Sequence, residues 1–427
     1  MSSARTRTSA AALGLALVVA ACSATPAPSP TTAASGSGLA SAACPTGSES
    51  GTVARQVRLG GYDWTRIDAR QFGGSAVAAV AVMPDQRLLG LANWLAAVPD
   101  GAGRQPTVWT SRDCLAWSSQ PDSPAFAPTR ARWQDGVLGL AQKAGVFVAV
   151  GTESSEDASL ASAGAWFSLD GVTWTRSAVD GAAGRTMDAV MTTATGFVAL
   201  GEARYDIHAG FGGGTSIWTS PDGRTWTRLA VDAGPPRGTR LRTLVSRPGG
   251  FLATATFEVD EGSEGTPGPD LTSGIWTSDD GMRWQPVPGS PLGLNDLLRT
   301  AAGYLAIGSS TPDQSAPALA WRSIDGRTWT STALPAPADL PAGAAVFGQR
   351  IAGGHAGFVA LGGRTDTFAD LAWSSRDGVT WTAIDLASVL GDAIVDGLVP
   401  IGDALLLNGH RVLPNGSWNP VAWLLTP

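Results

Sequence analysis

The stretch Trp218-Thr-Ser-Pro-Asp-Gly-Arg-Thr-Trp226 is one copy of a unit that recurs along the chain. In every copy the second Trp follows the first by eight positions, and a Ser stands two residues after the first Trp. An Asp stands two residues after that Ser. The other copies are Trp109 to Trp117, which has Cys114 where the others have Gly, Trp166 to Trp174, Trp276 to Trp284, Trp321 to Trp329 and Trp373 to Trp381.

Each copy predicts a tight β-hairpin with a structural turn. Gly accepts a positive φ, and an Asp carboxylate accepts the backbone N–H groups of a turn. Because side chains alternate along a strand, both tryptophans fall on one face of the paired strands, within cross-strand reach. We therefore expect the turn acids to shape the hairpin and not to act in catalysis. They are Asp113, Asp170, Asp222, Asp279, Asp325 and Asp377.

The spacing of the units predicts the fold. The first tryptophans are 57, 52, 58, 45 and 52 residues apart, a period typical of propeller blades. Before each hairpin stands a short apolar run bounded by Gly, such as Gly196 to Gly201, and before that a run of small and β-branched residues, such as Ala189–Ala194. Each unit thus has four short strands, A to D from the axis outward. Four antiparallel strands at this period predict an all-β fold, the β-propeller.

The chain ends predict the number of blades. Val421-Ala-Trp423 has the character of a C strand with no D strand after it, and Tyr62-Asp-Trp64-Thr65 that of a D strand with nothing before it. Joining the two fragments gives six complete blades and a seventh built from both termini. This closure removes two exposed sheet edges. We predict a seven-bladed propeller over residues 58–427.

The repeated Ser-x-Asp-Gly-x-x-Trp resembles the Asp-box of the bacterial neuraminidase (BNR) repeat superfamily, which covers sialidases, sortilin-like receptors and a photosystem assembly factor. The resemblance spans about residues 58–427 and implies a propeller. The usual box has one residue between Asp and Gly, and this chain has none. A sialidase of this superfamily uses a Tyr nucleophile, an Asp acid/base and three Arg. Here Tyr205 is the one Tyr expected at the ligand face, and only Arg242 and Arg350 are placed for the Arg role.

The N-terminus has the pattern of a targeting segment. Residues 1–21 have a basic start, a short apolar run and the ending Val-Ala-Ala before Cys22, which resembles a bacterial lipobox with a lipidated Cys. Residues 22–57 are rich in Ser, Thr, Ala, Pro and Gly and are expected to form a flexible tether. We expect a lipoprotein on the outer face of the cell membrane, with an ordinary secreted protein as the alternative. In that oxidising compartment Cys44 and Cys114 are expected to form a disulfide.

Composition excludes some classes of function. The 427 residues carry a net charge of -7, which argues against nucleic acid as a partner. The three His are scattered, and no Cys/His cluster has metal-ligand spacing, so we expect neither a metal nor a cofactor. The acidic segment Glu258–Asp270 lacks a recognised calcium pattern, and calcium binding there is a weaker alternative.

The candidate ligand site is the mouth of the central channel, which the D–A and B–C loops surround while the box turns face away. Aligning the A strands gives one residue per blade. These are Ser75, Asp135, Asp188, Arg242, Asp296, Arg350 and Asp396. We expect this ring, with Tyr205 of a B–C loop, to bind a polar ligand such as a sugar or a cationic peptide group. The alternative is a self-neutralising collar of salt bridges that keeps the channel hydrated.

Three functions fit these features. The first is a non-enzymatic scaffold that binds an envelope protein or a glycan, because the fold signal is strong while a complete catalytic signature is absent. The second is a sialidase-like exo-glycosidase. The third is a lipoprotein that captures an extracellular solute for a transporter.

Overall fold

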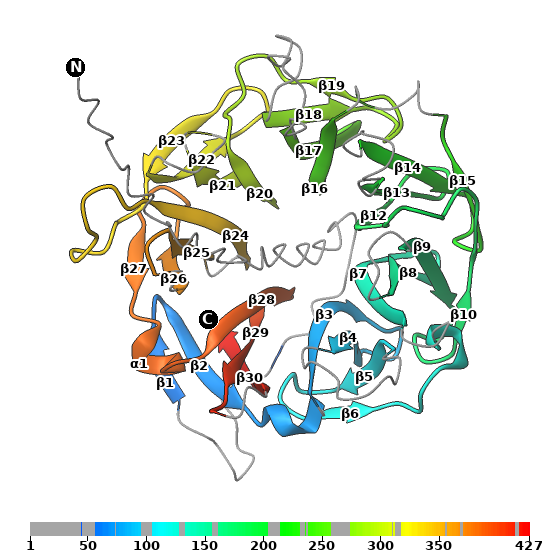
Figure 1. Cartoon of the computed structure of the whole chain (residues 1–427), viewed down its shortest axis with the longest axis horizontal. Coiled ribbons are helices and arrows are strands. Elements are labelled where there is room, and N and C mark those ends of the chain that lie inside the picture. Colours follow the sequence, from blue (N-terminus) through cyan, green and yellow to red (C-terminus); the bar gives the residue numbers. More distant parts are fainter. Residues whose placement is uncertain are drawn as a thin grey trace, which may run out of the picture.

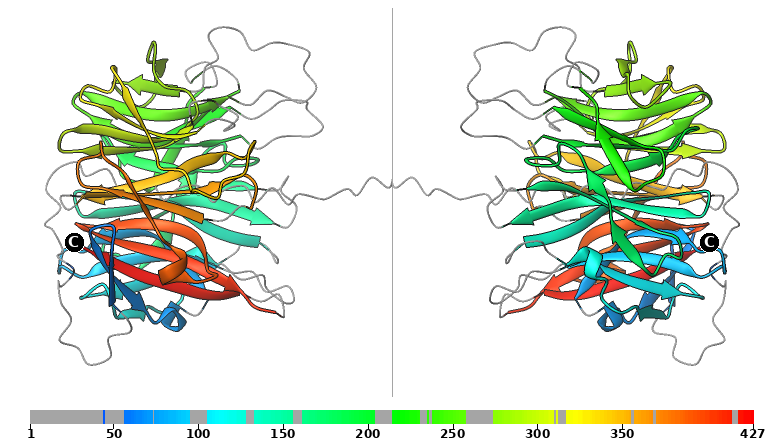
Figure 2. Two further views of the ribbon diagram at one scale, coloured as in Figure 1. Left: turned by 90° about the vertical axis from the view of Figure 1, so that its left-hand side faces the viewer. Right: turned by 90° about the vertical axis from the view of Figure 1, so that its right-hand side faces the viewer.

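The computed structural model describes Cys44 and residues 56–427, apart from 73, 95–104, 128–132, 156–160, 204–213, 231–234, 236–237, 258–273, 310, 312–316, 355–356, 368–369 and 415–417. The strands form seven antiparallel blades around a central axis (Figure 1). Seen from the side, the strands run from one face of the ring toward the other (Figure 2). The prediction of an all-β, seven-bladed propeller is confirmed.

Blades 1 to 4 follow the chain, each with its strands in the order A to D. Blade 1 consists of β3 (Ser75–Val82), β4 (Leu88–Trp94), β5 (Thr107–Ser111) and β6 (Trp117–Ser119). Blade 2 consists of β7 (Trp133–Lys143), β8 (Val146–Ser155), β9 (Ser162–Ser168) and β10 (Trp174–Arg176). Blade 3 consists of β12 (Ala189–Thr192), β13 (Phe197–Glu202), β14 (Thr215–Ser220) and β15 (Thr225–Arg228), with β11 (Ala178–Val179) parallel to its outer edge. Blade 4 consists of β16 (Thr239–Arg247), β17 (Gly250–Phe257), β18 (Gly274–Ser278) and β19 (Gln285–Pro286).

Blades 5 to 7 complete the ring. Blade 5 consists of β20 (Leu294–Thr300), β21 (Gly303–Ser309), β22 (Ala318–Ser323) and β23 (Thr330–Ala333). Blade 6 consists of β24 (Val346–Gly354), β25 (Gly357–Arg364), β26 (Asp370–Ser375) and β27 (Thr382–Ile384). Blade 7 consists of β28 (Ile394–Ile401), β29 (Ala404–Val412), β30 (Trp418–Thr426), β2 (Tyr62–Ile67) and β1 (Gln56–Leu59). Helical segments of the described residues are short: η1 (Ala69–Phe72), η2 (Pro124–Phe126) and α1 (Ala387–Leu390).

Both termini build the last blade, as predicted. The N-terminal β2 pairs antiparallel with the C-terminal β30, and Trp64 lies opposite Leu425. Strand β1, which the sequence did not predict, pairs with the outer edge of β2. The Tyr62 hydroxyl donates to the Gly357 carbonyl at 2.8 Å and so joins blade 7 to blade 6. Burial, with the charge of Asp403, raises the pKa of Tyr62 to about 12.

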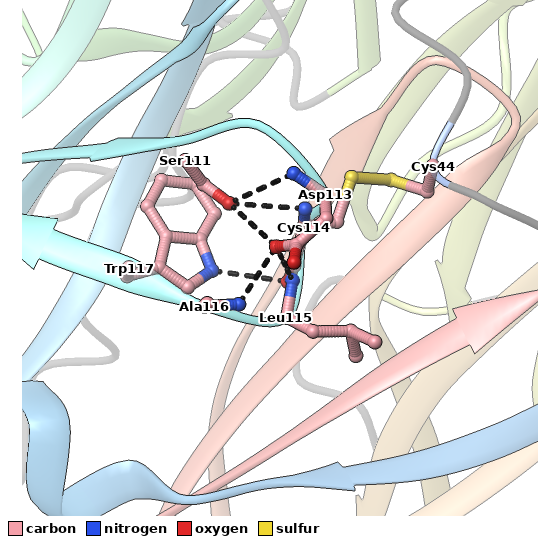
Figure 3. The surroundings of a disulfide bond; sticks show 7 residues. All are labelled: Cys44, Ser111, Asp113, Cys114, Leu115, Ala116 and Trp117. Carbon is pink, nitrogen blue, oxygen red and sulfur yellow. Dashed lines mark hydrogen bonds between the residues drawn. A yellow bond between two sulfur atoms is a disulfide. The ribbon is translucent and has the colours of Figure 1, made fainter. Parts of the chain in front are cut away.

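The expected disulfide joins Cys44 to Cys114 (Figure 3), with Cα atoms 5.5 Å apart. Cys114 takes the place of the turn Gly and has φ +66°. Both cysteines are buried in one apolar cluster with Leu406 and Leu424 of blade 7, so the bridge lies at the seam where blades 7 and 1 meet. Cys22, the expected signal peptide and most of the expected tether lie outside the described residues. Within the described part of the chain, no helix has the length and apolar character needed to cross a bilayer.

The two tryptophans of a unit share one face, as predicted from the strand alternation. In blade 2 the ring of Phe126 lies 5.3 Å from Trp166 and 5.6 Å from Trp174. Phe126 belongs to η2, in the connection that leads from blade 1 to blade 2. The paired indoles therefore pack against the connection between blades and hold neighbouring blades together.

A β-bulge interrupts the A–B pairing in six blades. In blade 2 the register shifts between Val137 and Gly139, opposite Gly151 and Val150. This geometry brings an A-strand carbonyl onto the Gly that closes the B strand, and a Cβ on Gly151 would lie 1.8 Å from the Gly136 oxygen. The close approach explains why the apolar B-strand runs end in Gly. It also places the bulges of the A strands next to the channel.

Candidate functional site

The Ser and Asp side chains of the box turns form hydrogen bonds within their own turn. In blade 2 the Ser168 hydroxyl accepts the N–H of Gly171 at 2.8 Å and donates to Asp170 Oδ1 at 3.0 Å. Asp170 Oδ1 also accepts two backbone N–H groups, at 2.7 and 2.8 Å. The same arrangement recurs at Asp113, Asp222, Asp325 and Asp377.

Backbone N–H donation is the main reason that the pKa values of Asp222, Asp325 and Asp377 lie below the usual range. These carboxylates stay ionised and stabilise the turn. The C–D turns lie at the opposite ends of the strands from the B–C loops. The geometry thus gives the box acids a turn-forming role away from the channel mouth.

The turn acid of the fourth copy is Asp280, and the prediction of Asp279 is wrong. Asp280 Oδ1 accepts the Ser278 hydroxyl at 3.1 Å and two backbone N–H groups at 2.8 Å each. Asp279 occupies the variable position between Ser and Asp, where its exposed carboxylate pairs with Arg247. The reason is the spacing itself, because the turn needs the carboxylate two residues after the Ser.

The seven residues of the predicted ring occupy different positions relative to the A-strand bulges. Arg242, Asp296, Arg350 and Asp396 lie at or directly beside the A-strand bulges of blades 4 to 7. Asp188 directly precedes β12, and its carboxylate accepts the Thr186 hydroxyl at 3.0 Å. Ser75 and Asp135 lie farther from the bulges: each stands three residues before the bulged residue of its blade, which is Ala78 in blade 1 and Leu138 in blade 2. Ser75 is buried, and the side chain of Asp135 lies outside the described part.

Asp296 joins three blades. Its Oδ1 accepts the Thr243 hydroxyl of blade 4 at 2.8 Å and its own neighbour's N–H, that of Leu297, at 2.9 Å. Its Oδ2 accepts the N–H of Ile351 in blade 6 at 2.9 Å. Burial raises the pKa of Asp296, while these hydrogen bonds and the charge of Arg350 act in the other direction. Because both oxygens accept hydrogen bonds within the fold, Asp296 is a structural link between blades.

A recess lies between blades 6 and 7, beside this link. It is small and partly open to solvent, and its polar walls come from Gln349, Arg350, Asp370 and Asp396. Asp370 Oδ2 accepts the N–H of Val395 at 2.6 Å. Burial raises the pKa of Asp370; the charge of Asp396 adds to the rise, while the Val395 hydrogen bond and His410 oppose it. Burial lowers the pKa of Arg350, and the charges of Asp296 and Asp396 oppose that change.

A histidine and a tryptophan of the β29–β30 hairpin lie beside Asp396, which is one of the residues that line the recess. His410 Nδ1 lies 2.8 Å and 3.0 Å from the two oxygens of Asp396, and the imidazole is buried. The Trp418 ring stacks on the imidazole with centroids 4.3 Å apart and planes inclined by 18°. Trp418 remains 39% exposed, so the edge of the stack meets solvent. The arrangement thus joins a carboxylate of the recess, through the imidazole, to an exposed indole.

The sequence alignment found Arg350 and Asp396 but missed Asp370, His410 and Trp418. Two signals were present: Trp418 is a tryptophan off the repeated motif, and His410 is one of three histidines in the chain. Tyr205 and the acidic segment Glu258–Asp270 lie outside the described residues. Among the residues that the structure describes, no group of His, Cys, Asp and Glu is arranged to hold a metal ion.

Comparison with known proteins gives structural likenesses alone. No protein-family profile and no curated protein matches the chain. Among solved structures, an α-L-arabinanase of Penicillium chrysogenum is similar with a TM-score of 0.45 and 14% identity, covering 87% of this chain and 98% of that one. A protein of unknown function from Dyadobacter fermentans has a TM-score of 0.45 and 12% identity over 83% and 94% of the two chains. A Trypanosoma rangeli sialidase mutant has 0.40 and 11% over 72% and 54%. At these levels they carry no argument about activity.

Proposed function

We propose that the protein is a lipid-anchored, extracytoplasmic propeller that acts as a binding or assembly scaffold. Its ligand is a sugar or a cationic group of an envelope protein, bound at the recess between blades 6 and 7. The observation that carries the proposal is the half-exposed Trp418 stacked on His410, next to Asp396 and Asp370. Carboxylates bind hydroxyl and ammonium donors, and an indole face attracts cations and apolar sugar faces.

A scaffold fits the state of the ring better than a hydrolase does. Asp296 has both oxygens engaged by backbone and hydroxyl donors, which leaves it no proton-transfer role. The box acids hold their own turns through hydrogen bonds to Oδ1. The polar groups that reach the recess are held by neighbouring strands, an arrangement suited to rigid recognition.

The binding test compares the full mature chain with variants of the stack. Trp418→Ala and Asp396→Asn are expected to weaken binding of the glycan or cationic peptide selected from an array by roughly tenfold or more. Val412→Ala is the matched control, because Val412 is paired with Trp418 across the hairpin and is exposed but lies outside the stack. Equal affinities for all four proteins would contradict a site at this recess.

The anchor is tested separately. The Cys44–Cys114 disulfide supports an oxidising compartment. The Cys22→Ala variant is expected to move from the membrane fraction to the medium in cell fractionation. Retention of that variant in the membrane fraction would contradict lipid anchoring through Cys22.

A glycoside hydrolase is the second candidate, and one observation favours it. Asp370 and Asp396 line the same recess, and burial raises the pKa of Asp370, as a general acid requires. Turnover of a fluorogenic sialoside by the purified chain, lost in both Asp370→Asn and Tyr205→Phe, would replace the scaffold proposal. Absence of turnover with retained binding would favour the scaffold.

A further inference from the structure

The connection between blades 2 and 3 crosses the seam of these blades on the mouth side of the ring. Its turn, residues 181–184, is tied to the start of the C strand of blade 2, because Ala163 donates to the Ala182 carbonyl at 3.0 Å and Gly184 donates to the Ala161 carbonyl at 2.8 Å. The next residue, Arg185, forms a bridge with Ala203 at the end of the B strand of blade 3. C strands begin and B strands end on the face that carries the B–C loops.

Two arginines converge on this turn. Arg185 Nη1 donates to the carbonyls of Gly181 at 3.3 Å and Ala183 at 2.8 Å. Arg228, the last residue of β15, packs on the same turn, since a Cβ built on Gly181 would lie 2.4 Å from Arg228 Nε. The two guanidinium groups are therefore neighbours, although Arg185 lies in the connection before β12 and Arg228 ends β15.

Within the described residues no carboxylate pairs with either arginine. Of the acids near the turn, Glu202 pairs with Arg240 at 3.0 Å, and Asp188 accepts the Thr186 hydroxyl. Arg185 Nε and Arg228 Nε are both buried and without a hydrogen-bond partner. Burial, with the adjacent charge of Arg228, lowers the pKa of Arg185. Two unneutralised cations side by side are unusual in a chain whose net charge is -7, and buried polar atoms normally have partners.

We propose that Arg185 and Arg228 form an oxyanion-binding site, separate from the recess between blades 6 and 7, that takes a phosphate-type dianion. A dianion neutralises both guanidinium groups at once and removes their mutual repulsion. Guanidinium groups present planar pairs of N–H donors that match phosphate oxygens, and such charge-assisted bonds are among the strongest in proteins. The two Nε–H groups supply donors that the protein itself does not use.

The test is calorimetric titration of the full chain with inorganic phosphate at constant ionic strength. Arg185→Gln and Arg228→Met are each expected to weaken phosphate binding by roughly tenfold or more, because each removes charged hydrogen bonds. The variant Arg228→Met keeps the aliphatic stem that packs on Gly181. The matched control is Arg70→Gln, since Arg70 is an exposed arginine whose carboxylate partner, Asp68, lies 2.8 Å away. Phosphate affinity of this control is expected to equal that of the parent.

Three outcomes would overturn the site. The first is equal phosphate affinity in the parent and its three variants. Phosphate also acts on proteins that have no binding site, through its exclusion from their surface, and that effect would not distinguish the variants. The second is acetate, a monoanion, binding as tightly as phosphate, because the site would then not select a dianion. The third is a loss of phosphate binding in the control Arg70→Gln as large as that in Arg185→Gln and Arg228→Met, with an unchanged near-ultraviolet tryptophan spectrum in all three variants. Partial retention in Arg228→Lys, which keeps the charge without the fork, supports the proposal.

Discussion

The bulge of blade 2 predicts opposite effects for two glycines that face each other. In Gly151→Ala the new Cβ would lie 1.8 Å from the Gly136 carbonyl oxygen and 2.8 Å from its carbon. Since carbon and oxygen approach closely only to about 3.3 Å, strands β7 and β8 must separate by about 1.5 Å. That movement also disturbs the bond from the Met187 N–H to the Gly151 carbonyl, which joins blade 3 to blade 2. We expect a loss of about 3–4 kcal/mol in the free energy of unfolding.

Gly136→Ala is the control within the same bulge. A Cβ at Gly136 meets nothing nearer than Asn93 Nδ2 at 4.0 Å, and its backbone is not in the left-handed region. Because Ala lowers the entropy of the unfolded chain, this variant is expected to match the parent or to exceed it by up to about 1 kcal/mol. Urea unfolding followed by tryptophan fluorescence measures both midpoints. Midpoints that are equal for Gly151→Ala and Gly136→Ala would refute the steric reasoning.

Three further predictions concern the turns and the seam. Asp280→Ala is expected to cost about 1–3 kcal/mol because two N–H groups lose their acceptor, whereas Asp279→Ala stays within about 0.5 kcal/mol; thermal unfolding compares the two. Reduction of the disulfide, whose cysteines are 70 residues apart, is expected to cost about 4 kcal/mol and to lower the melting temperature, and an unchanged melt with reductant would contradict a role at the seam. The box carboxylates have pKa values lowered by folding, so their contribution is complete above the unfolded pKa, about 3.9, and is lost as the pH falls through the folded values. The urea concentration at the unfolding midpoint is expected to decrease once the pH drops below about 4, and Asp280→Asn is expected to make that decrease shallower.

The sequence predicted what local patterns and chain closure determine. The box turns, the shared tryptophan face and the pairing of β2 with β30 each follow from residues within one unit or from its interrupted period. Strand β1 escaped because Gln56–Leu59 is short and carries no repeated motif. The box acid of blade 4 was misassigned where two Asp stand together, although the Ser spacing distinguishes Asp280 from Asp279.

The candidate recess was only half predictable. Arg350 and Asp396 lie on A strands, where the repeat itself gives an alignment. Asp370 begins a C strand, and His410 and Trp418 extend the β29–β30 hairpin beyond the length of the repeat. Their proximity depends on hairpin length and on contact between blades, and the spacing of the tryptophans predicts neither.

The polarity of the bulged residue differs between the blades, and this bears on where a ligand binds. The bulged residue is apolar in blades 1 and 2, where it is Ala78 and Leu138. It is polar in blades 5 to 7, where it is Asn295, Gln349 and Asp396. Because these blades share the backbone bulge, the difference between them lies in the side chains. The bulges of blades 5 to 7 therefore bring polar groups to the channel, and this is the part of the ring that contains the recess of Arg350, Asp370 and Asp396.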